Sequence, residues 1–224
     1  MRQFIRLFMP FFVFCFTGCD DPAIIPIRRY EQWWIDRHND RINIIPNQKL
    51  IFIGDSITQG LEETGIWTAL NQRYNKRITN LGFGGDQTQN VIWRLENGEF
   101  PIGINPEYVV LMIGTNNQHE PKSIAAGIGE IVKIINKNSP LTKIVLLSIL
   151  PRGSGKDDIN TIRNNAVNEI IKKYDRHLRI EYLDIGQYYM DDNGVLKDEL
   201  FTDGLHLTLA GYNLLMEKIE EIIE

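Results

Sequence analysis

Five short apolar runs, each followed within three residues by a glycine, constrain the fold of this chain more than any other feature. Near-continuous runs rich in β-branched residues are typical of strands buried on both faces, and such strands form parallel sheets. We therefore expect a five-stranded parallel sheet from these runs. They cover residues 50–53, 77–81, 108–113, 143–150 and 179–185.

Amphipathic stretches between these runs predict helices on both faces of the sheet. Apolar residues recur there at three- and four-residue spacing, which is typical of helices with one buried face. The stretches are 66–74, 87–97, 122–138 and 159–174, with a last one at 209–223. Alternating strands and helices predict a doubly wound α/β sandwich. Ligands bind such sheets beyond the carboxyl ends of the strands, where we look for functional residues.

Length and charge exclude several classes of protein. The chain has 224 residues, enough for one domain with additions. Its net charge of −5 leaves no dominant basic surface, so we expect no nucleic-acid partner. The two cysteines, Cys15 and Cys19, both lie near the N-terminus, so the body of the chain has no disulfide and no thiolate metal site.

The first 18 residues have the organisation of a bacterial export signal. Arg2 and Arg6 precede an apolar run at 7–16 that is too short to span a bilayer as a helix. The ending FTGC is similar to a lipoprotein signal, in which cleavage precedes a cysteine that becomes lipid-modified. This interpretation predicts a signal peptide at 1–18, lipidation of Cys19, a tether at 19–29 and an exported protein anchored to the periplasmic or cell-surface face of a membrane. A plain signal peptide or a membrane-lying helix is the alternative.

Ser56 stands in the sequence GDSIT directly after the first apolar run. A serine in a tight strand-to-helix turn projects its hydroxyl from the top of the sheet, near a helix N-terminus that favours negative charge. Such a hydroxyl can act as a nucleophile when a base lies beside it. The alternative is that Ser56 or Thr58 merely caps a helix.

Two later segments offer hydrogen-bond donors for an oxyanion. The sequence NLGFGGD follows the second run, and its glycines let the backbone approach a ligand closely. The sequence GTNN follows the third run, and an asparagine amide is a neutral donor that stabilises developing negative charge. A plain loop and ordinary turn chemistry are the alternatives for these two segments.

Asp203 and His206 lie three residues apart, just before the last predicted helix. On a turn the two side chains can touch, so that the carboxylate holds one ring nitrogen and the other is free to act as a base. The other histidines are weaker candidates. His177 lies in a charged run, His38 precedes the first strand, and His119 has only the adjacent Glu120 as a nearby carboxylate.

Together the four segments resemble the SGNH (GDSL-type) hydrolase superfamily, whose blocks appear here as GDSIT, NLGFGGD, GTNN and DGLH. The stretches VIWRLENGE, ILPRGSG and DGLHLTLAGY are similar to the branch that contains the platelet-activating-factor acetylhydrolase catalytic subunits. They are equally similar to its secreted bacterial relatives, often described as sugar or sialate O-acetylesterases. The resemblance covers about 30–224 and implies a flavodoxin-like three-layer sandwich.

The resemblance also implies roles for five residues. Ser56 would be the nucleophile, His206 the base and Asp203 the residue that orients the histidine. The backbone N–H groups of Ser56 and Gly85 and the side-chain amide of Asn116 would bind the oxyanion. No metal and no organic cofactor is implied.

We expect a serine ester hydrolase that removes a short acyl group, acetyl above all, from a carbohydrate or related small ester. The blocks leave no long insertion that could form a hydrophobic lid. Trp67, His119 and Arg152 are candidates for lining the site, with helix packing as the alternative for Trp67. The competing functions are a lipid-directed acetylhydrolase or lysophospholipase, an acyltransferase and a non-catalytic glycan-binding lipoprotein. A homodimer is compatible with the sequence, which leaves the oligomeric state open.

Overall fold

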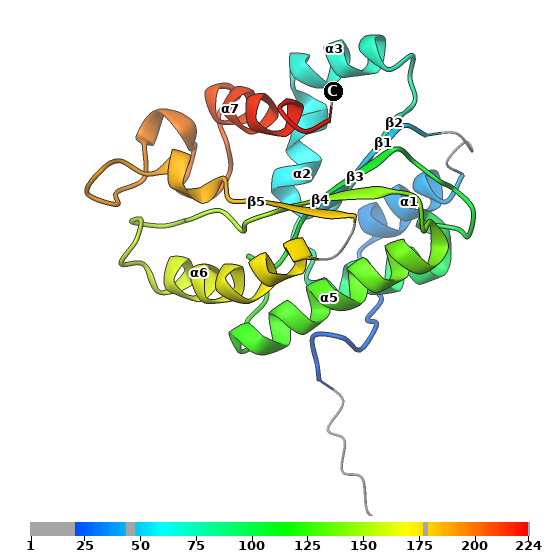
Figure 1. Ribbon diagram of the computed structural model, residues 1–224, viewed down its shortest axis with the longest axis horizontal. Helices are drawn as coiled ribbons and strands as arrows, with labels where there is room; N and C mark the ends of the chain where they lie inside the picture. Colours follow the sequence, from blue (N-terminus) through cyan, green and yellow to red (C-terminus); the bar gives the residue numbers. More distant parts are fainter. Residues whose placement is uncertain (1–20, 44–47, 177–178, 224) are drawn as a thin grey trace, which may run out of the picture.

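A single parallel sheet of five strands forms the centre of the protein (Figure 1). The computed structural model describes residues 21–43, 48–176 and 179–223, so the predicted signal peptide and Cys19 lie outside the described residues. The strand order is β2-β1-β3-β4-β5. The strands are β1 (Leu50–Gly54), β2 (Ile78–Gly82), β3 (Tyr108–Met112), β4 (Lys143–Leu147) and β5 (Ile180–Leu183).

Helices cover both faces of this sheet (Figure 1). The helices α2, α3 and α7 lie on one side, and α5 and α6 lie on the other. This arrangement confirms the predicted three-layer α/β sandwich with the flavodoxin-like strand order. The helices are α1 (Gln32–Arg41), α2 (Ser56–Gly60), α3 (Gly65–Arg73), α4 (Thr88–Arg94), α5 (Pro121–Asn138), α6 (Ile159–Ile171) and α7 (Leu209–Glu220), with short helices η1 (Leu61–Glu63), η2 (Leu95–Glu99), η3 (Lys172–Arg176), η4 (Gly186–Tyr189) and η5 (Asp198–Leu200).

Alternating side chains of each strand divide the core into two layers. Ile51 and Ile53 of β1 pack into the layer under α4, α5 and α6. Leu50 and Phe52 pack into the opposite layer, which includes apolar residues of α2, α3 and α7. A strand that is buried on both faces needs apolar residues at every position. This explains why the strands coincide with the near-continuous apolar runs of the sequence.

The structure differs from the sequence-based boundaries in identifiable places. β4 ends at Leu147, because the Asn168 side chain of α6 accepts from the Ile149 N–H (2.8 Å) and donates to the Ile149 carbonyl (2.9 Å). The sequence patterns did not predict α1, whereas the start of α2 follows the strand-to-helix turn that was expected at Ser56. Only Trp34 and His38 of α1 are buried, so this helix has one i,i+4 pair instead of an apolar stripe.

The segment predicted as a tether packs against the domain over its described residues, 21–29. Ala23 is fully buried, and its carbonyl accepts a hydrogen bond from the Thr88 hydroxyl of α4 (2.9 Å). The Ile27 N–H donates to the Gln89 carbonyl (3.1 Å), and the Ile27 carbonyl accepts from the Asn90 side chain (2.9 Å). Backbone groups of the segment make these hydrogen bonds, so the pattern of apolar residues in the sequence does not indicate them.

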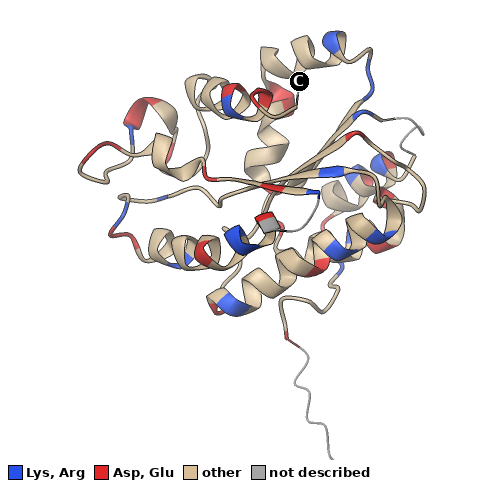
Figure 2. Cartoon of the chain, in the orientation of Figure 1, with Lys and Arg blue, Asp and Glu red and all other residues tan. Residues whose placement is uncertain are grey.

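Basic and acidic residues both occur along α5, α6 and α7 and form no single basic face in the view of Figure 2. Within the part of the chain that the structure describes, no helix combines the length and the apolar character needed to cross a membrane.

A cluster of charges is buried between α1, α4 and the loop after β2. Arg94 is fully buried, and its Nε donates to Asp86 Oδ2 (2.8 Å). Its Nη1 pairs with Glu99, which also contacts His38 Nδ1 (2.8 Å). The Trp34 indole N–H donates to Asp86 Oδ1 (2.8 Å). Arg94 therefore compensates two buried carboxylates at once.

We predict that Arg94→Met lowers the free energy of unfolding by about 3–5 kcal/mol, because it removes the buried cation that is bonded to both Asp86 and Glu99. Chemical denaturation measures this loss. The matched control is Arg73→Met, which breaks the exposed pair between Arg73 and Glu220 and should cost less than about 1 kcal/mol. Equal losses in the two variants would contradict a special role for the buried cluster.

Candidate active site

The candidate site lies beyond the carboxyl ends of β1, β2 and β3, where the four sequence segments meet. The chain passes from β1 to β2 on one side and then returns to β3 on the other side of β1. Ligands bind open α/β sheets at such a switch point. Ser56 follows β1 and Asn116 follows β3, so both residues stand beside it.

The turn at Ser56 is shaped by its neighbours in the sequence. Ser56 is the first residue of α2, so its N–H has no partner within the helix. The Asp55 side chain caps that helix by accepting from the Ile57 N–H (3.0 Å). A Cβ atom at Gly54 would collide with the Thr58 hydroxyl and the Met112 carbonyl, which explains the glycine before this turn.

Ser56, His206 and Asp203 form one hydrogen-bonded chain. His206 Nε2 lies 3.0 Å from Ser56 Oγ, although the two residues are 150 positions apart. His206 Nδ1 lies 2.7 Å from Asp203 Oδ2. The structure therefore brings together the hydroxyl, imidazole and carboxylate that the sequence analysis singled out.

Asp203 is held by backbone donors as well as by the imidazole. Its Oδ1 accepts from the N–H groups of His206 (2.7 Å) and Leu205 (3.0 Å). These hydrogen bonds, led by that of the His206 N–H, lower the pKa of the Asp203 carboxyl to about 2. Asp203, whose side chain is 53% exposed, is therefore a carboxylate at neutral pH.

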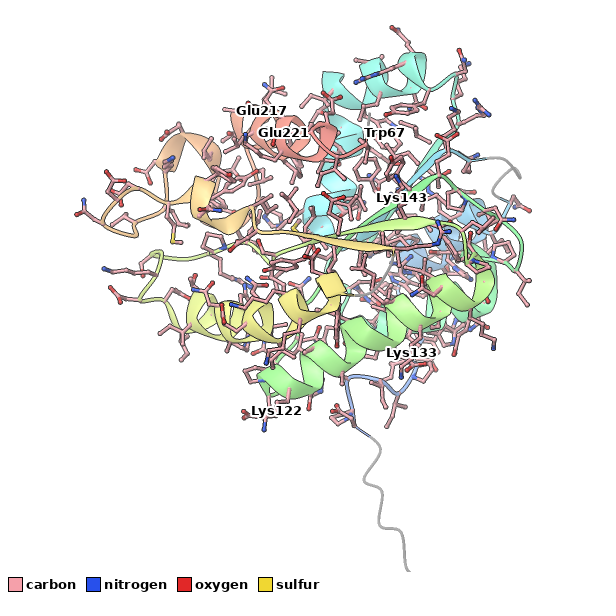
Figure 3. All side chains as sticks on the ribbon, in the orientation of Figure 1. Trp67, Lys122, Lys133, Lys143, Glu217 and Glu221 are labelled. Atoms are coloured by element: carbon pink, nitrogen blue, oxygen red, sulfur yellow. The ribbon has the colours of Figure 1, made fainter. Side chains whose placement is uncertain are left out.

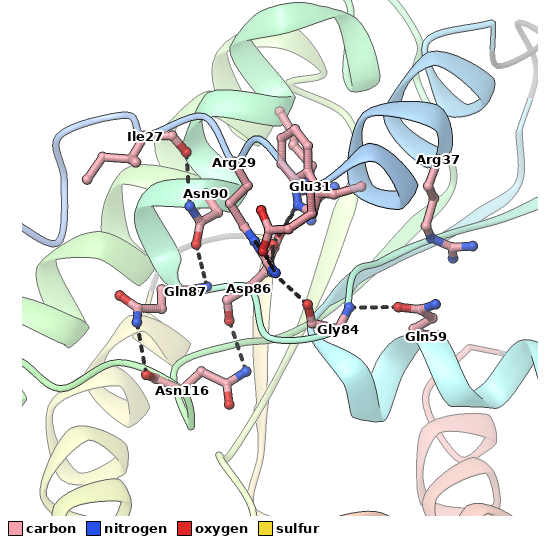
Figure 4. Close-up of polar contacts among 12 residues, drawn as sticks. Ile27, Arg29, Glu31, Arg37, Gln59, Gly84, Asp86, Gln87, Asn90 and Asn116 are labelled. Carbon is pink, nitrogen blue, oxygen red and sulfur yellow. Dashed lines mark hydrogen bonds and ion pairs between the residues drawn. The ribbon is translucent and has the colours of Figure 1, made fainter.

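The glycine loop after β2 lies directly beside Ser56. A Cβ atom built on Gly84 would be 3.9 Å from Ser56 Cβ. The Gly84 N–H donates to the Gln59 side chain (2.6 Å), which ties the loop to α2 (Figure 4). Gly85 has a φ of +76°, a conformation that favours glycine. Its N–H is bonded to no acceptor among residues 21–43, 48–176 and 179–223.

Asn116 is connected to the same loop. Its Nδ2 donates to the Asp86 carbonyl (3.1 Å), and its own carbonyl accepts from the Gln87 side chain (3.2 Å) (Figure 4). A side-chain amide carries two N–H bonds, so this contact leaves one for a ligand. Asn116 and Gly85 therefore lie on two loops that are joined by hydrogen bonds.

The three peripheral candidates have different surroundings. Arg152 Nη1 donates to the Thr115 carbonyl (3.2 Å), next to Asn116. His119 Nδ1 lies 3.3 Å from the Asn117 side chain. Trp67 lies between α3 and the sheet (Figure 3) and packs edge-on against Phe52, with ring centroids 5.9 Å apart. Trp67 therefore packs a helix against the sheet, which was the alternative to its predicted role in lining the site.

Of the rival histidines, His38 is buried and bonded to Glu99, and His177 lies outside the described residues.

Residues without a motif also contribute to this site. Gln59 holds the glycine loop, and Arg163 Nη2 joins Arg152 at the Thr115 carbonyl (3.3 Å). No periodicity or motif spacing marks these side chains, because each contact joins residues that are far apart in the sequence.

A pocket of about 580 Å³ opens beside Ser56 and His206. Its rim combines polar side chains of α2 and η1 with apolar residues near α7, and Glu63 is its acidic member. The lining residues are Ser56, Gln59, Gly60, Glu63, Thr64, Gly65, His206, Leu207, Leu209 and Tyr212.

The comparisons with known proteins agree with this geometry. The model of the GDSL-like Lipase/Acylhydrolase family matches residues 52–214. The chain is 32% identical over 214 residues to platelet-activating factor acetylhydrolase IB subunit alpha2 of Rattus norvegicus, covering 92% of each protein. It is 34% identical over 177 residues to the alpha1 subunit of Homo sapiens, covering 78% of this chain and 75% of the relative.

Two solved structures show the same fold at lower identity. A GDSL-like lipase from Bacteroides thetaiotaomicron has a TM-score of 0.71 and 19% identity, with 84% of this chain and 96% of that chain covered. An acetyl xylan esterase has a TM-score of 0.66 and 20% identity, with 79% of this chain and all of that chain covered, at 100%.

Asp55, next to Ser56, gives the site a pH-dependent contribution to stability. Complete burial raises the pKa of its carboxyl to about 7 from an ordinary value of 3.8. Because the folded state binds this proton more tightly than the unfolded state, the resulting stability is present below pH 3.8 and is lost as the pH rises through about 7.

We predict that Asp55→Asn removes this pH dependence while keeping a side-chain oxygen for the helix cap. The unfolding free energy of the wild type should fall relative to that of the variant by up to about 4 kcal/mol between acidic and neutral pH. Urea unfolding of both proteins at several pH values measures the difference. Parallel pH profiles would contradict the proposed titration of Asp55.

Proposed function

Because the chain belongs to the GDSL-like lipase/acylhydrolase family and is a carboxylic-ester hydrolase, we propose that it is a serine esterase that releases acetyl groups from carbohydrates. The observation that carries the proposal is the hydrogen-bonded chain from Ser56 through His206 to Asp203. These three side chains are a nucleophile, a base and a group that orients the base, at distances that allow proton transfer.

In the proposed mechanism, Ser56 Oγ attacks the ester carbonyl while His206 Nε2 takes the serine proton. Asp203 keeps the proton of the neutral imidazole on Nδ1 and stabilises the imidazolium that forms. His206 then protonates the leaving alcohol oxygen, and the acetyl group remains on Ser56. Water repeats the same steps on this acyl-enzyme and releases acetate.

Three donors would stabilise the tetrahedral oxyanion. The N–H groups of Ser56 and Gly85 have no partner in the helix or loop that carries them, and Asn116 has one amide N–H to spare. Donors that are already in place cost no reorganisation when charge develops on the substrate oxygen.

The relatives favour acetyl as the acyl group, because both the acetylhydrolase subunits and the acetyl xylan esterase are named for acetyl esters. The pocket favours a sugar as the alcohol part. Gln59, Glu63 and Thr64 offer hydrogen-bonding groups to hydroxyls. Among the described residues, those that line the pocket include Glu63 but no lysine or arginine for a phosphate. Trp33, 44% exposed, lies beside Gly84 with the Arg29 guanidinium over one face of its ring (5.4 Å from the centroid), and the exposed part of the ring is an aromatic surface for a sugar.

A lipid-directed acetylhydrolase is the second candidate, since the curated relatives carry the name of a lipid-directed enzyme. Export and lipidation at Cys19 are part of the main proposal. Arg29 contacts the glycine loop and Ala23 contacts α4, so a lipid on Cys19 would hold this side of the domain close to a membrane surface.

We predict that the enzyme releases acetate from acetylated xylo-oligosaccharides or other acetylated sugars at least about tenfold more efficiently than it releases acetate from acetylated glycerophospholipids or fatty acid from lysophospholipids. The released acetate or fatty acid is measured across this panel, with Ser56→Ala as the control. The control should lose activity by a factor on the order of 10⁴ or more. A preference for the lipid esters would favour the second candidate, and equal rates for wild type and control would overturn the serine mechanism.

We predict that Asn116→Ala lowers kcat by about 100- to 1000-fold with a similar KM, because it removes one oxyanion donor. Steady-state kinetics with 4-nitrophenyl acetate measure the loss. The matched control is Gln118→Ala, which shortens an exposed side chain on the same loop and should retain activity. Full activity in Asn116→Ala would remove this residue from the oxyanion site.

A further inference from the structure

Arg29, which precedes α1, reaches the glycine loop that carries the proposed oxyanion donor (Figure 4). Its Nη1 donates to the Gly84 carbonyl at 2.6 Å, the shorter of its two contacts with this loop. The same nitrogen lies 3.2 Å from Asp86 Oδ1. A Cβ atom built on Gly85 would be 3.2 Å from Nη1, so the guanidinium lies against the backbone of this residue.

The Gly84 carbonyl and the Gly85 N–H belong to one peptide group. A cation bonded to the carbonyl oxygen of a peptide draws electron density toward that oxygen and makes the N–H of the same group a stronger donor. The contact also fixes the plane of the peptide, because Gln59 holds Gly84 from its other side. A glycine pair without these two bonds would have unusual conformational freedom.

Arg29 is connected to the second donor as well. The Asp86 side chain that it contacts belongs to the residue whose carbonyl accepts from Asn116. Arg29 is itself held by Glu31, which accepts from Nε (3.1 Å) and Nη2 (2.5 Å). That hydrogen bond lowers the pKa of the Glu31 carboxyl to about 2, so the pair is ionised at neutral pH.

We propose that Arg29 is a positioning residue of the esterase, which orients and polarises the Gly84–Gly85 peptide toward the oxyanion. This inference rests on the proposed function. Arg29 lies outside residues 52–214, which match the family model, so the role belongs to the N-terminal segment of this chain. The segment at 21–29 is accordingly part of the catalytic structure as well as a connection to the predicted anchor.

The test uses the full chain and 4-nitrophenyl acetate, a small ester that needs no sugar contacts. Arg29→Met keeps the apolar stem and removes the donor and the charge. We expect kcat to fall about 5- to 10-fold with KM within about twofold, since the effect acts on the transition state. The matched control is Arg28→Met, which removes the exposed neighbouring arginine and should leave kcat unchanged.

A second measurement separates positioning from stability. Dialkyl 4-nitrophenyl phosphates phosphorylate serine esterases through a transition state in which the phosphoryl oxygen uses the oxyanion donors. The second-order inactivation rate of Arg29→Met should fall by the same factor as kcat. Arg29→Lys should recover most of both rates, because an ammonium group can also donate to the Gly84 carbonyl.

The proposal is overturned if Arg29→Met and Arg28→Met have the same kcat, if only KM changes, or if the lost rate equals the lost fraction of folded protein. It is also overturned if Arg29→Lys is as slow as Arg29→Met while both are folded. A failure of the esterase assignment itself would be recognised separately, because Ser56→Ala would then hydrolyse 4-nitrophenyl acetate as fast as the wild type.

Discussion

The parallel direction of the five strands is the constraint on which the rest of this structure depends. Because all carboxyl ends lie at one edge of the sheet, segments that are far apart in the sequence emerge side by side there. Ser56 leaves β1 at this edge, and the turn before α7 brings His206 over it, 150 residues later. An antiparallel sheet with the same motifs would place alternate loops at opposite ends and would keep these side chains apart.

Arginine contacts recur on the proposed oxyanion side of the site. Arg29 donates to the Gly84 carbonyl, and Arg152 and Arg163 donate to the Thr115 carbonyl. The residues that follow Gly84 and Thr115 in the sequence, Gly85 and Asn116, are proposed oxyanion donors. The two loops are also joined to each other, through the Asp86 carbonyl and the Asn116 side chain. The donors are therefore held by a network of charged and amide groups, and the Asp86 carboxylate links that network to the fully buried Arg94.

The sequence predicted the parts of this architecture that follow from local patterns. The five apolar runs predicted five strands, and the blocks around Ser56, Gly85, Asn116 and His206 predicted which loops meet. Helix α1 escaped prediction because a single buried pair anchors its face. The packing of residues 21–29 on α4 and the contacts of Arg29 with the glycine loop could not be predicted, because they consist of backbone and side-chain hydrogen bonds across more than 50 residues of sequence. Such contacts leave no periodicity, and only the folded chain brings their partners together.

The most direct test of the account is the reaction of the folded protein with a fluorophosphonate probe, followed by identification of the modified peptide by mass spectrometry. The probe reacts with serine hydroxyls that a neighbouring base activates and that lie beside oxyanion donors. We expect modification at Ser56 alone in the wild type, and a strong decrease in its rate in His206→Ala. Modification of a different serine, or a rate at Ser56 that does not depend on His206, would contradict the account.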